Sequence, residues 1–189
     1  MEKKVFLLDA FALVFRAYYV LIRSPRLTSK GKNTNAQFGF TTTLLDLIQK
    51  EKPTHLAVVF DTHAPTERHI DFTAYKANRQ ETPEDILSAI PDIKRIVKGF
   101  NLPCLELDGF EADDIIGTIC HDHGTELNIG AEKYLVLSGD KDYIQLQTYE
   151  NVDQYDPIRK RWIRNDNPDK YLKEHILKGD TGDGVPNVL

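Results

Sequence analysis

The segment KKVFLLDA, residues 3–10, decides the fold class, because a short apolar run in it leads straight into an acid. A run without polar alternation is typical of a strand buried on both faces of a parallel sheet. A helical pattern follows over residues 11–22, and further apolar runs at 55–61, 102–107 and 133–142 are separated by helical patterns. This alternation predicts an α/β fold with a mostly parallel central sheet flanked by helices.

The remaining segments extend the same alternation. Pro91 is expected to break the helical pattern at 86–100 or to begin a new helix. Residues 62–85 are polar and of mixed charge, with no clear core face. The other predicted elements are a loop at 24–35, helices at 36–52 and 169–177, a strand, turn and strand at 151–164, and a glycine-rich loop at 178–189.

Composition is that of a globular protein rather than a membrane protein. Hydrophobic residues make up 41% and charged residues 28%, and no run of about 18 apolar residues occurs. Asp9 and Arg16 interrupt the apolar N-terminal stretch, which argues against a signal peptide. Cys104 and Cys120 lack metal-type spacing and are expected to be buried thiols in a reducing compartment. We therefore expect a cytoplasmic protein without a membrane anchor.

Acidic residues follow the predicted strands. Ligand sites in open α/β sheets form outside the carboxyl ends of the strands, where these acids should converge. The segment GFEADDIIGT (109–118) brings three more carboxylates to the mouth of a predicted helix, and GDTGD (179–183) adds two. The nine predicted site acids are Asp9, Asp61, Glu111, Asp113, Asp114, Asp140, Asp142, Asp180 and Asp183.

Nine carboxylates in one crevice repel one another, so cations are expected among them. Oxygen ligands suit Mg²⁺ or Mn²⁺, and two such ions about 4 Å apart stabilise the attacking and leaving oxygens of phosphoryl transfer. Histidine and cysteine are missing from these motifs, which disfavours zinc. An alternative for EADD (111–114) is a helix start, because acids in a first turn oppose the macrodipole.

The net charge of −5 conceals a basic remainder, because −5 + 9 = +4 once the nine acids are set aside. Residues 1–34 hold seven Lys or Arg against two acids, and residues 158–178 hold seven against three. This favours a polyanionic substrate, although basic runs are also typical of solvated surface. If AYKANR (74–79) is helical, Lys76 and Arg79 share a face and could bind phosphate, with Tyr75 stacked on a base. The alternative is an exposed mixed-charge helix.

Several segments together resemble the 5′-nuclease domain of bacterial DNA polymerase I, a family that includes flap endonucleases and phage ribonuclease H enzymes. The resemblance covers nearly the whole chain. From about residue 150 the sequence is closer to the stand-alone phage enzymes. The segments are FLLDAFALVFRAYY (6–19), NTNAQFGFTTTLL (33–45), KPTHLAVVFD (52–61), YKANRQETPEDI (75–86), GFEADDIIGT (109–118) and SGDKDYIQL (138–146).

The resemblance implies a PIN-like fold with a helical arch or clamp from Thr62 to about Asp92, threaded by single-stranded DNA. It makes Lys76 and Arg79 catalytic phosphate-binding cations and places Arg16 and Phe38 near a duplex junction. The implied first metal site is lined by Asp9, Asp61, Glu111 and Asp113. The implied second site is lined by Asp140, Asp142 and Asp183, with Asp114 and Asp180 assisting through water.

The chain departs from the family pattern in two places. A helix–hairpin–helix element that grips duplex DNA, often with bound K⁺, usually follows the last motif, whereas this chain stops at Leu189. We therefore expect one 5′-nuclease domain over residues 1–189, either a fragment or a protein whose duplex grip is supplied otherwise. Gly184 stands where the family often has asparagine.

The expected activity is that of a monomeric, Mg²⁺- or Mn²⁺-dependent 5′–3′ exonuclease or flap endonuclease in replication and repair. Its substrates would be DNA 5′ ends and flaps, or RNA primers in RNA–DNA hybrids, and a replication polymerase is a candidate partner. One alternative is a non-catalytic DNA-binding module of the same fold. Another is a PIN-type toxin ribonuclease, which would leave the YKANRQETPED segment unexplained.

Overall fold

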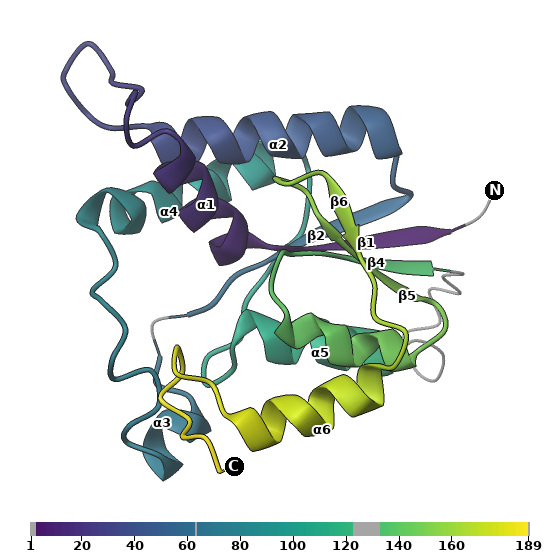
Figure 1. Ribbon diagram of the computed structural model, residues 1–189. Coiled ribbons are helices and arrows are strands. Elements are labelled where there is room, and N and C mark those ends of the chain that lie inside the picture. Colours follow the sequence, from purple (N-terminus) through teal and green to yellow (C-terminus); the bar gives the residue numbers. More distant parts are fainter. Residues whose placement is uncertain (1–2, 63, 123–132, 189) are drawn as a thin grey trace.

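The computed structural model describes residues 3–62, 64–122 and 133–188 (Figure 1). In this part of the chain six strands form one sheet in the order β3-β2-β1-β4-β5-β6. Neighbours from β3 to β5 run parallel, and β6 is antiparallel to β5. The strands are β1 (Lys4–Asp9), β2 (His55–Val59), β3 (Cys104–Leu105), β4 (Lys133–Leu137), β5 (Val152–Asp156) and β6 (Arg161–Ile163).

Helices cover both faces of the sheet, as the alternation predicts (Figure 1). On one face lie α1 (Ala10–Val20), α2 (Asn35–Glu51) and α4 (Glu84–Gly99). On the other lie α5 (Ala112–His121), the 3₁₀ helix η1 (Asp142–Thr148) and α6 (Pro168–Lys178). The short helix α3 (Glu67–Asp71) stands away from the sheet, beside the C-terminal loop.

Strand β1 is central and buried on both faces. Phe6 and Leu8 belong to the core under α1, α2 and α4, and Val5 and Leu7 to the core under α5 and η1. Successive side chains of a strand point to opposite faces, so an uninterrupted apolar run can serve two cores. Burial of β1 on both faces therefore explains the uninterrupted apolar run in KKVFLLDA.

The direction of the strand order changes at β1. From β1 the chain adds β2 and β3 on one side, and then crosses through α5 to add β4 on the other side of β1. Such a switch point leaves a crevice outside the carboxyl ends of the two central strands. Asp9 ends β1 and Asp140 follows β4, so both acids stand at this crevice.

The expected break at Pro91 is wrong. Pro91 lies inside α4, which is continuous from Glu84 to Gly99. Proline removes one helical hydrogen bond, but α4 has buried core side chains before Pro91, such as Ile86, and after it, such as Ile93 and Val97. Burial of one continuous apolar face outweighs the local cost.

The segment expected to form an arch is divided between two environments. Its last part, from Glu84 onward, belongs to α4 and packs into the core. Residues 67–71 form α3, and residues 73–79 are turns and a bend in which Lys76 has φ 56°. Lys76 and Arg79 therefore do not share a helical face, contrary to expectation.

Other expectations were met only in part. The third strand is reduced to two residues, and the helix η1 was not predicted. Cys120 is fully buried, whereas Cys104 is only partly buried. Within the described residues, we find no helix of sufficient length and apolarity to span a bilayer.

Candidate metal centre

The innermost acid of the site is Asp9. Its Oδ1 accepts a hydrogen bond from Ala12 N at 3.1 Å and so caps α1. Its Oδ2 lies 3.1 Å from Ser138 Oγ and 3.3 Å from Tyr143 OH. The same phenol lies 2.6 Å from Asp113 Oδ1. Tyr143 of η1 therefore joins the acid that ends β1 to an acid in the first turn of α5.

Two further acids stand beside this group. Asp61 follows β2, and its Oδ1 accepts a hydrogen bond from Ala112 N at 2.8 Å, which ties the strand end to α5. Asp140 follows β4 and accepts a hydrogen bond from Asp142 N at 3.0 Å. The ends of three neighbouring strands thus present acids toward the start of α5.

The two outer acids of EADD pair with cations of the segment between β2 and α4. Arg68 of α3 donates two hydrogen bonds to Asp114, at 2.9 and 2.5 Å. Glu111 contacts Lys76 Nζ at 2.7 Å and accepts from Tyr75 OH at 2.9 Å. The positive charge required at this helix mouth is therefore supplied, for Glu111 and Asp114, by side chains of the protein.

Residues 74–79 also lie against the C-terminal loop. Lys76 N donates to Asp183 O at 2.9 Å, and Arg79 forms an ion pair with the Asp183 carboxylate. Gly184 has φ +76°, and a Cβ added there would collide with the carbonyl oxygen of Ala74. The absence of a Cβ at Gly184 is what permits this close approach.

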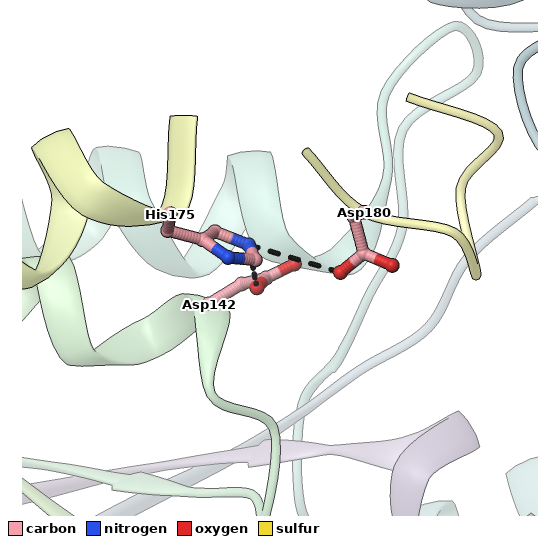
Figure 2. Close-up of side chains that lie close together, drawn as sticks. All are labelled: Asp142, His175 and Asp180. Carbon is pink, nitrogen blue, oxygen red and sulfur yellow. Dashed lines mark ion pairs between the residues drawn. The ribbon is translucent and has the colours of Figure 1, made fainter. Parts of the chain in front are cut away.

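A separate group contains a histidine that the sequence motifs did not include. Figure 2 shows His175 of α6 facing Asp142 of η1 and Asp180 of the C-terminal loop, with an ion pair to each. His175 Nε2 lies 3.2 Å from Asp142 Oδ1 and 3.7 Å from Asp180 Oδ2. Asp180 is also paired with Lys141 at 2.8 Å. His175 therefore lies beside two of the predicted site acids, although no motif of the sequence includes it.

Much of the site opens into one cavity of about 1140 Å³. Asp140 lines a smaller cavity of about 200 Å³ together with Arg16 and Asp156. Asp9 and Asp61 lie deeper and line neither cavity. The predicted site acids that line the larger cavity are Glu111, Asp113, Asp114, Asp142 and Asp183.

The residues expected to contact DNA are engaged within the protein. Arg16 Nη1 lies 2.9 Å from Oδ2 of the buried Asp156. The Tyr75 hydroxyl is bound to Glu111, and Lys76 Nζ lies 4.8 Å from the centroid of its ring. Phe38 is about half exposed, with the Arg26 guanidinium 5.3 Å from its ring centroid. Phe38 is more accessible than Arg16 or Tyr75.

Residues 4–176 match the family model of the 5′-3′ exonuclease, N-terminal resolvase-like domain. The chain belongs to this family. It is 34% identical over 203 residues to DNA polymerase I of Bacillus subtilis, covering 99% of this chain and 22% of that polymerase. It is 35% identical over 202 residues to the 5′-3′ exonuclease of Aquifex aeolicus, covering 98% of this chain and 65% of that protein. The chain thus spans about a fifth of the curated polymerases it matches.

Solved structures share the fold of this exonuclease-family chain. The D15 flap endonuclease of bacteriophage T5, in a complex with DNA and metal ions, superposes with a TM-score of 0.77 at 18% identity over 98% of this chain and 70% of that one. The T5 5′-exonuclease with bound zinc gives a TM-score of 0.74 at 20% identity with the same coverage. The mostly parallel sheet flanked by helices is therefore the architecture of known 5′-nucleases.

Electrostatics divide the acids of the exonuclease-family site into two groups. Burial raises the pKa of Asp9 to about 7, and repulsion by Asp113 adds to the effect. Burial raises the pKa of Asp113 to about 6, with Asp140 and Asp61 raising it further. The hydrogen bonds from Arg68 lower the pKa of Asp114. Glu111 and Asp114 are thus paired with protein cations, whereas Asp9 and Asp113 have no ion-pair partner among the described residues.

The donor set fits hard divalent cations. Asp142 Oδ1 is solvent-inaccessible and receives no hydrogen bond from the described residues. Burial also raises the pKa of Asp142, and Asp140 adds to it. Buried carboxylate oxygens without hydrogen-bond donors are costly unless a cation contacts them. Asp142 has such an oxygen, and with Asp9 and Asp113 it offers the carboxylate ligands that Mg²⁺ and Mn²⁺ favour.

Sequence reasoning missed three participants. Arg68 gave no motif signal, and Tyr143 was not distinguished from core aromatics. His175 precedes the GDTGD loop by one helical turn, which was a usable signal. The helix-start interpretation of EADD also holds in part, because Asp114 Oδ2 accepts a hydrogen bond from Glu111 N at 3.0 Å, forming a capping box.

Proposed function

We propose that the protein is a metal-dependent 5′-nuclease that hydrolyses phosphodiester bonds of DNA at 5′ ends and flaps, leaving 5′-phosphate and 3′-hydroxyl products. The observation that carries this proposal is the convergence of acids from the ends of β1 and β2 and the start of α5, joined through Tyr143 and Ala112 N. Asp140, after β4, is near enough to Asp113 to raise its pKa. Family membership and the basic remainder of the chain support the same conclusion.

The acids would hold two divalent cations, Mg²⁺ or Mn²⁺. When bound, such ions polarise the scissile phosphate and stabilise its attacking and leaving oxygens. We assign Asp9, Asp61, Glu111 and Asp113 to one ion. We assign Asp140, Asp142 and Asp183 to the other, with Asp114 and Asp180 assisting through water.

Lys76 and Arg79 would bind the scissile phosphate. Each now holds a carboxylate at the cavity, Lys76 that of Glu111 and Arg79 that of Asp183. A phosphodiester offers these cations the same charge and the same oxygen ligands, so it can replace a carboxylate partner. Release of Lys76 from Glu111 also removes the cation beside the Tyr75 ring, which would leave that ring able to stack on a base.

The segment from α3 to Arg79 would guide the 5′ strand into the cavity. Arg68, Tyr75 and Lys76 all reach the cavity side of α5 from this segment. Phe38 and Arg16 would lie nearer the duplex. A polymerase domain is the proposed partner, in line with the relatives in which the matching region is part of DNA polymerase I. We propose that the domain itself is monomeric.

A labelled 5′-flap DNA, incubated with Mg²⁺ and then with EDTA, tests the proposal. Cleavage with Mg²⁺ alone is expected, and Asp140→Asn should abolish it. Asp153→Asn is the matched control, because Asp153 is a residue of β5 outside the site that pairs loosely with Lys133 at 3.8 Å. Binding without cleavage would instead indicate a DNA-binding module. Preference for single-stranded RNA would indicate a toxin-like ribonuclease.

A further inference from the structure

We propose that His175 is a nitrogen ligand of the cation held by Asp142 and Asp180, and that it makes this site favour transition-metal ions over Mg²⁺. The inference rests on the proposed function in that both acids belong to its metal centre. It changes one assignment there, because Asp180 would contact the ion directly rather than through water. Neither the family motifs nor the predicted acid set includes His175.

The geometry is that of three donors facing a common point. One ligand atom from each of Asp142, His175 and Asp180 lies within 4.8 Å of the other two (Figure 2). They come from three different elements, η1, α6 and the C-terminal loop, so no single helix start or acidic run explains their meeting. Contact between α6 and η1 brings the imidazole to the acids.

The contact between His175 and Asp142 is not an ordinary hydrogen bond. Nε2 lies 3.2 Å from Asp142 Oδ1, yet this oxygen receives no hydrogen bond from the described residues. A carboxylate oxygen and an imidazole nitrogen at this distance can both bind one cation.

Neighbouring contacts fix the orientation of these ligands. The His175 ring stacks on Tyr171, one turn earlier in α6, with ring centroids 5.9 Å apart and planes at 19°. Asp180 Oδ1 accepts a hydrogen bond from Gly182 N at 2.7 Å, which leaves Oδ2 facing the group. Lys141 now pairs with this Oδ2, but its half-exposed side chain can move into solvent and leave the oxygen free.

The donor chemistry decides which ion is favoured. Imidazole nitrogen suits first-row transition metals, whereas Mg²⁺ favours oxygen ligands and keeps its waters. A site with one nitrogen and two carboxylates should therefore gain affinity for Mn²⁺ from His175 and gain little for Mg²⁺.

The test measures Mn²⁺ bound to the whole, metal-free protein by electron paramagnetic resonance. Wild type should show coupling from a directly bound ¹⁴N that changes when histidine is labelled with ¹⁵N. His175→Gln should lose this coupling and weaken Mn²⁺ binding by about 10-fold or more, with a smaller change for Mg²⁺ measured by competition. His55→Gln is the matched control, because His55 begins β2 at the opposite edge of the sheet.

Absence of ¹⁴N coupling in wild type would overturn the inference even if the variant did not fold. Its persistence in His175→Gln, or an equal loss of Mn²⁺ and Mg²⁺ affinity, would overturn it too. The proposed function is judged separately, by Mg²⁺-dependent flap cleavage in wild type. Cleavage without nitrogen coupling refutes only the role of His175, and coupling without cleavage refutes only the nuclease.

Discussion

Replacement of Asp9 by asparagine should stabilise the metal-free protein at neutral and alkaline pH. Asp9 is buried, and its pKa is raised from 3.8 to about 7, first by burial and then by Asp113. A pKa difference of about 3 corresponds to about 4 kcal/mol between the two protonation states. This value is an upper limit for the gain, because Asp113 titrates in the same range and the amide cannot reproduce every contact.

The sign follows from the direction of the pKa change. The folded state binds the Asp9 proton more tightly than the unfolded state, so the contribution of this group is complete below about pH 4 and lost as pH rises through about 7. The amide that replaces the carboxyl group in Asp9→Asn carries no charge at any pH. The difference in free energy of unfolding between Asp9→Asn and wild type should therefore be small at about pH 4.5 and reach a few kcal/mol at about pH 8.

Urea unfolding in EDTA at several pH values measures this difference. Asp153→Asn, outside the site, should show no such pH dependence. Excess Mn²⁺ should then stabilise wild type, by about 2.7 kcal/mol at a concentration about 100 times the Kd, and stabilise Asp9→Asn less. A difference between variant and wild type that stayed constant or shrank as pH rose over this range would refute the account of a buried, uncompensated carboxylate.

Three further substitutions test other contacts. Lys76→Met should lower the rate of single-turnover flap cleavage by about 100-fold. The control Lys94→Met removes a cation paired with Glu106 and should leave the rate unchanged. Equal rates for the two variants would argue against a phosphate-binding role for Lys76. Gly184→Ala should cost about 1–3 kcal/mol and expose residues 72–79 to limited proteolysis, because φ is +76° and Ala74 O is in the way. Gly39→Ala should lower the free energy of unfolding in urea by about 1–3 kcal/mol, because its Cβ would lie 2.6 Å from Ala17 Cβ. Adding Ala17→Gly to this variant should restore part of the loss. Additive losses from the two substitutions would contradict the packing explanation.

The fold was predictable because its signals are local. The apolar runs at 3–10, 55–61 and 133–142 are continuous, and each leads into an acid, which indicates both parallel strands and their shared carboxyl edge. The prediction of a helix break at Pro91 was wrong because the low helix propensity of proline acts over one turn. The apolar face of α4 extends along the whole helix. Tertiary burial decided the outcome there.

The cations of the site were less predictable than its acids. The acids are placed by strand ends, which the sequence marks. Arg68 and Lys76 reach Asp114 and Glu111 from 35 or more residues away, from a five-residue helix and a turn that carry no periodic signal. The position of His175 depends on how α6 packs against η1. No residue of α6 is fully buried, so no buried apolar face of this helix predicts this contact.

The most direct test of the central claim is the anomalous scattering of a crystal of this protein soaked in Mn²⁺. The account predicts two peaks at the carboxyl edge of the sheet, one contacting Asp9 or Asp113 and the other contacting Asp142. A well-ordered site with the same acids in place and no peak near any of them would contradict it.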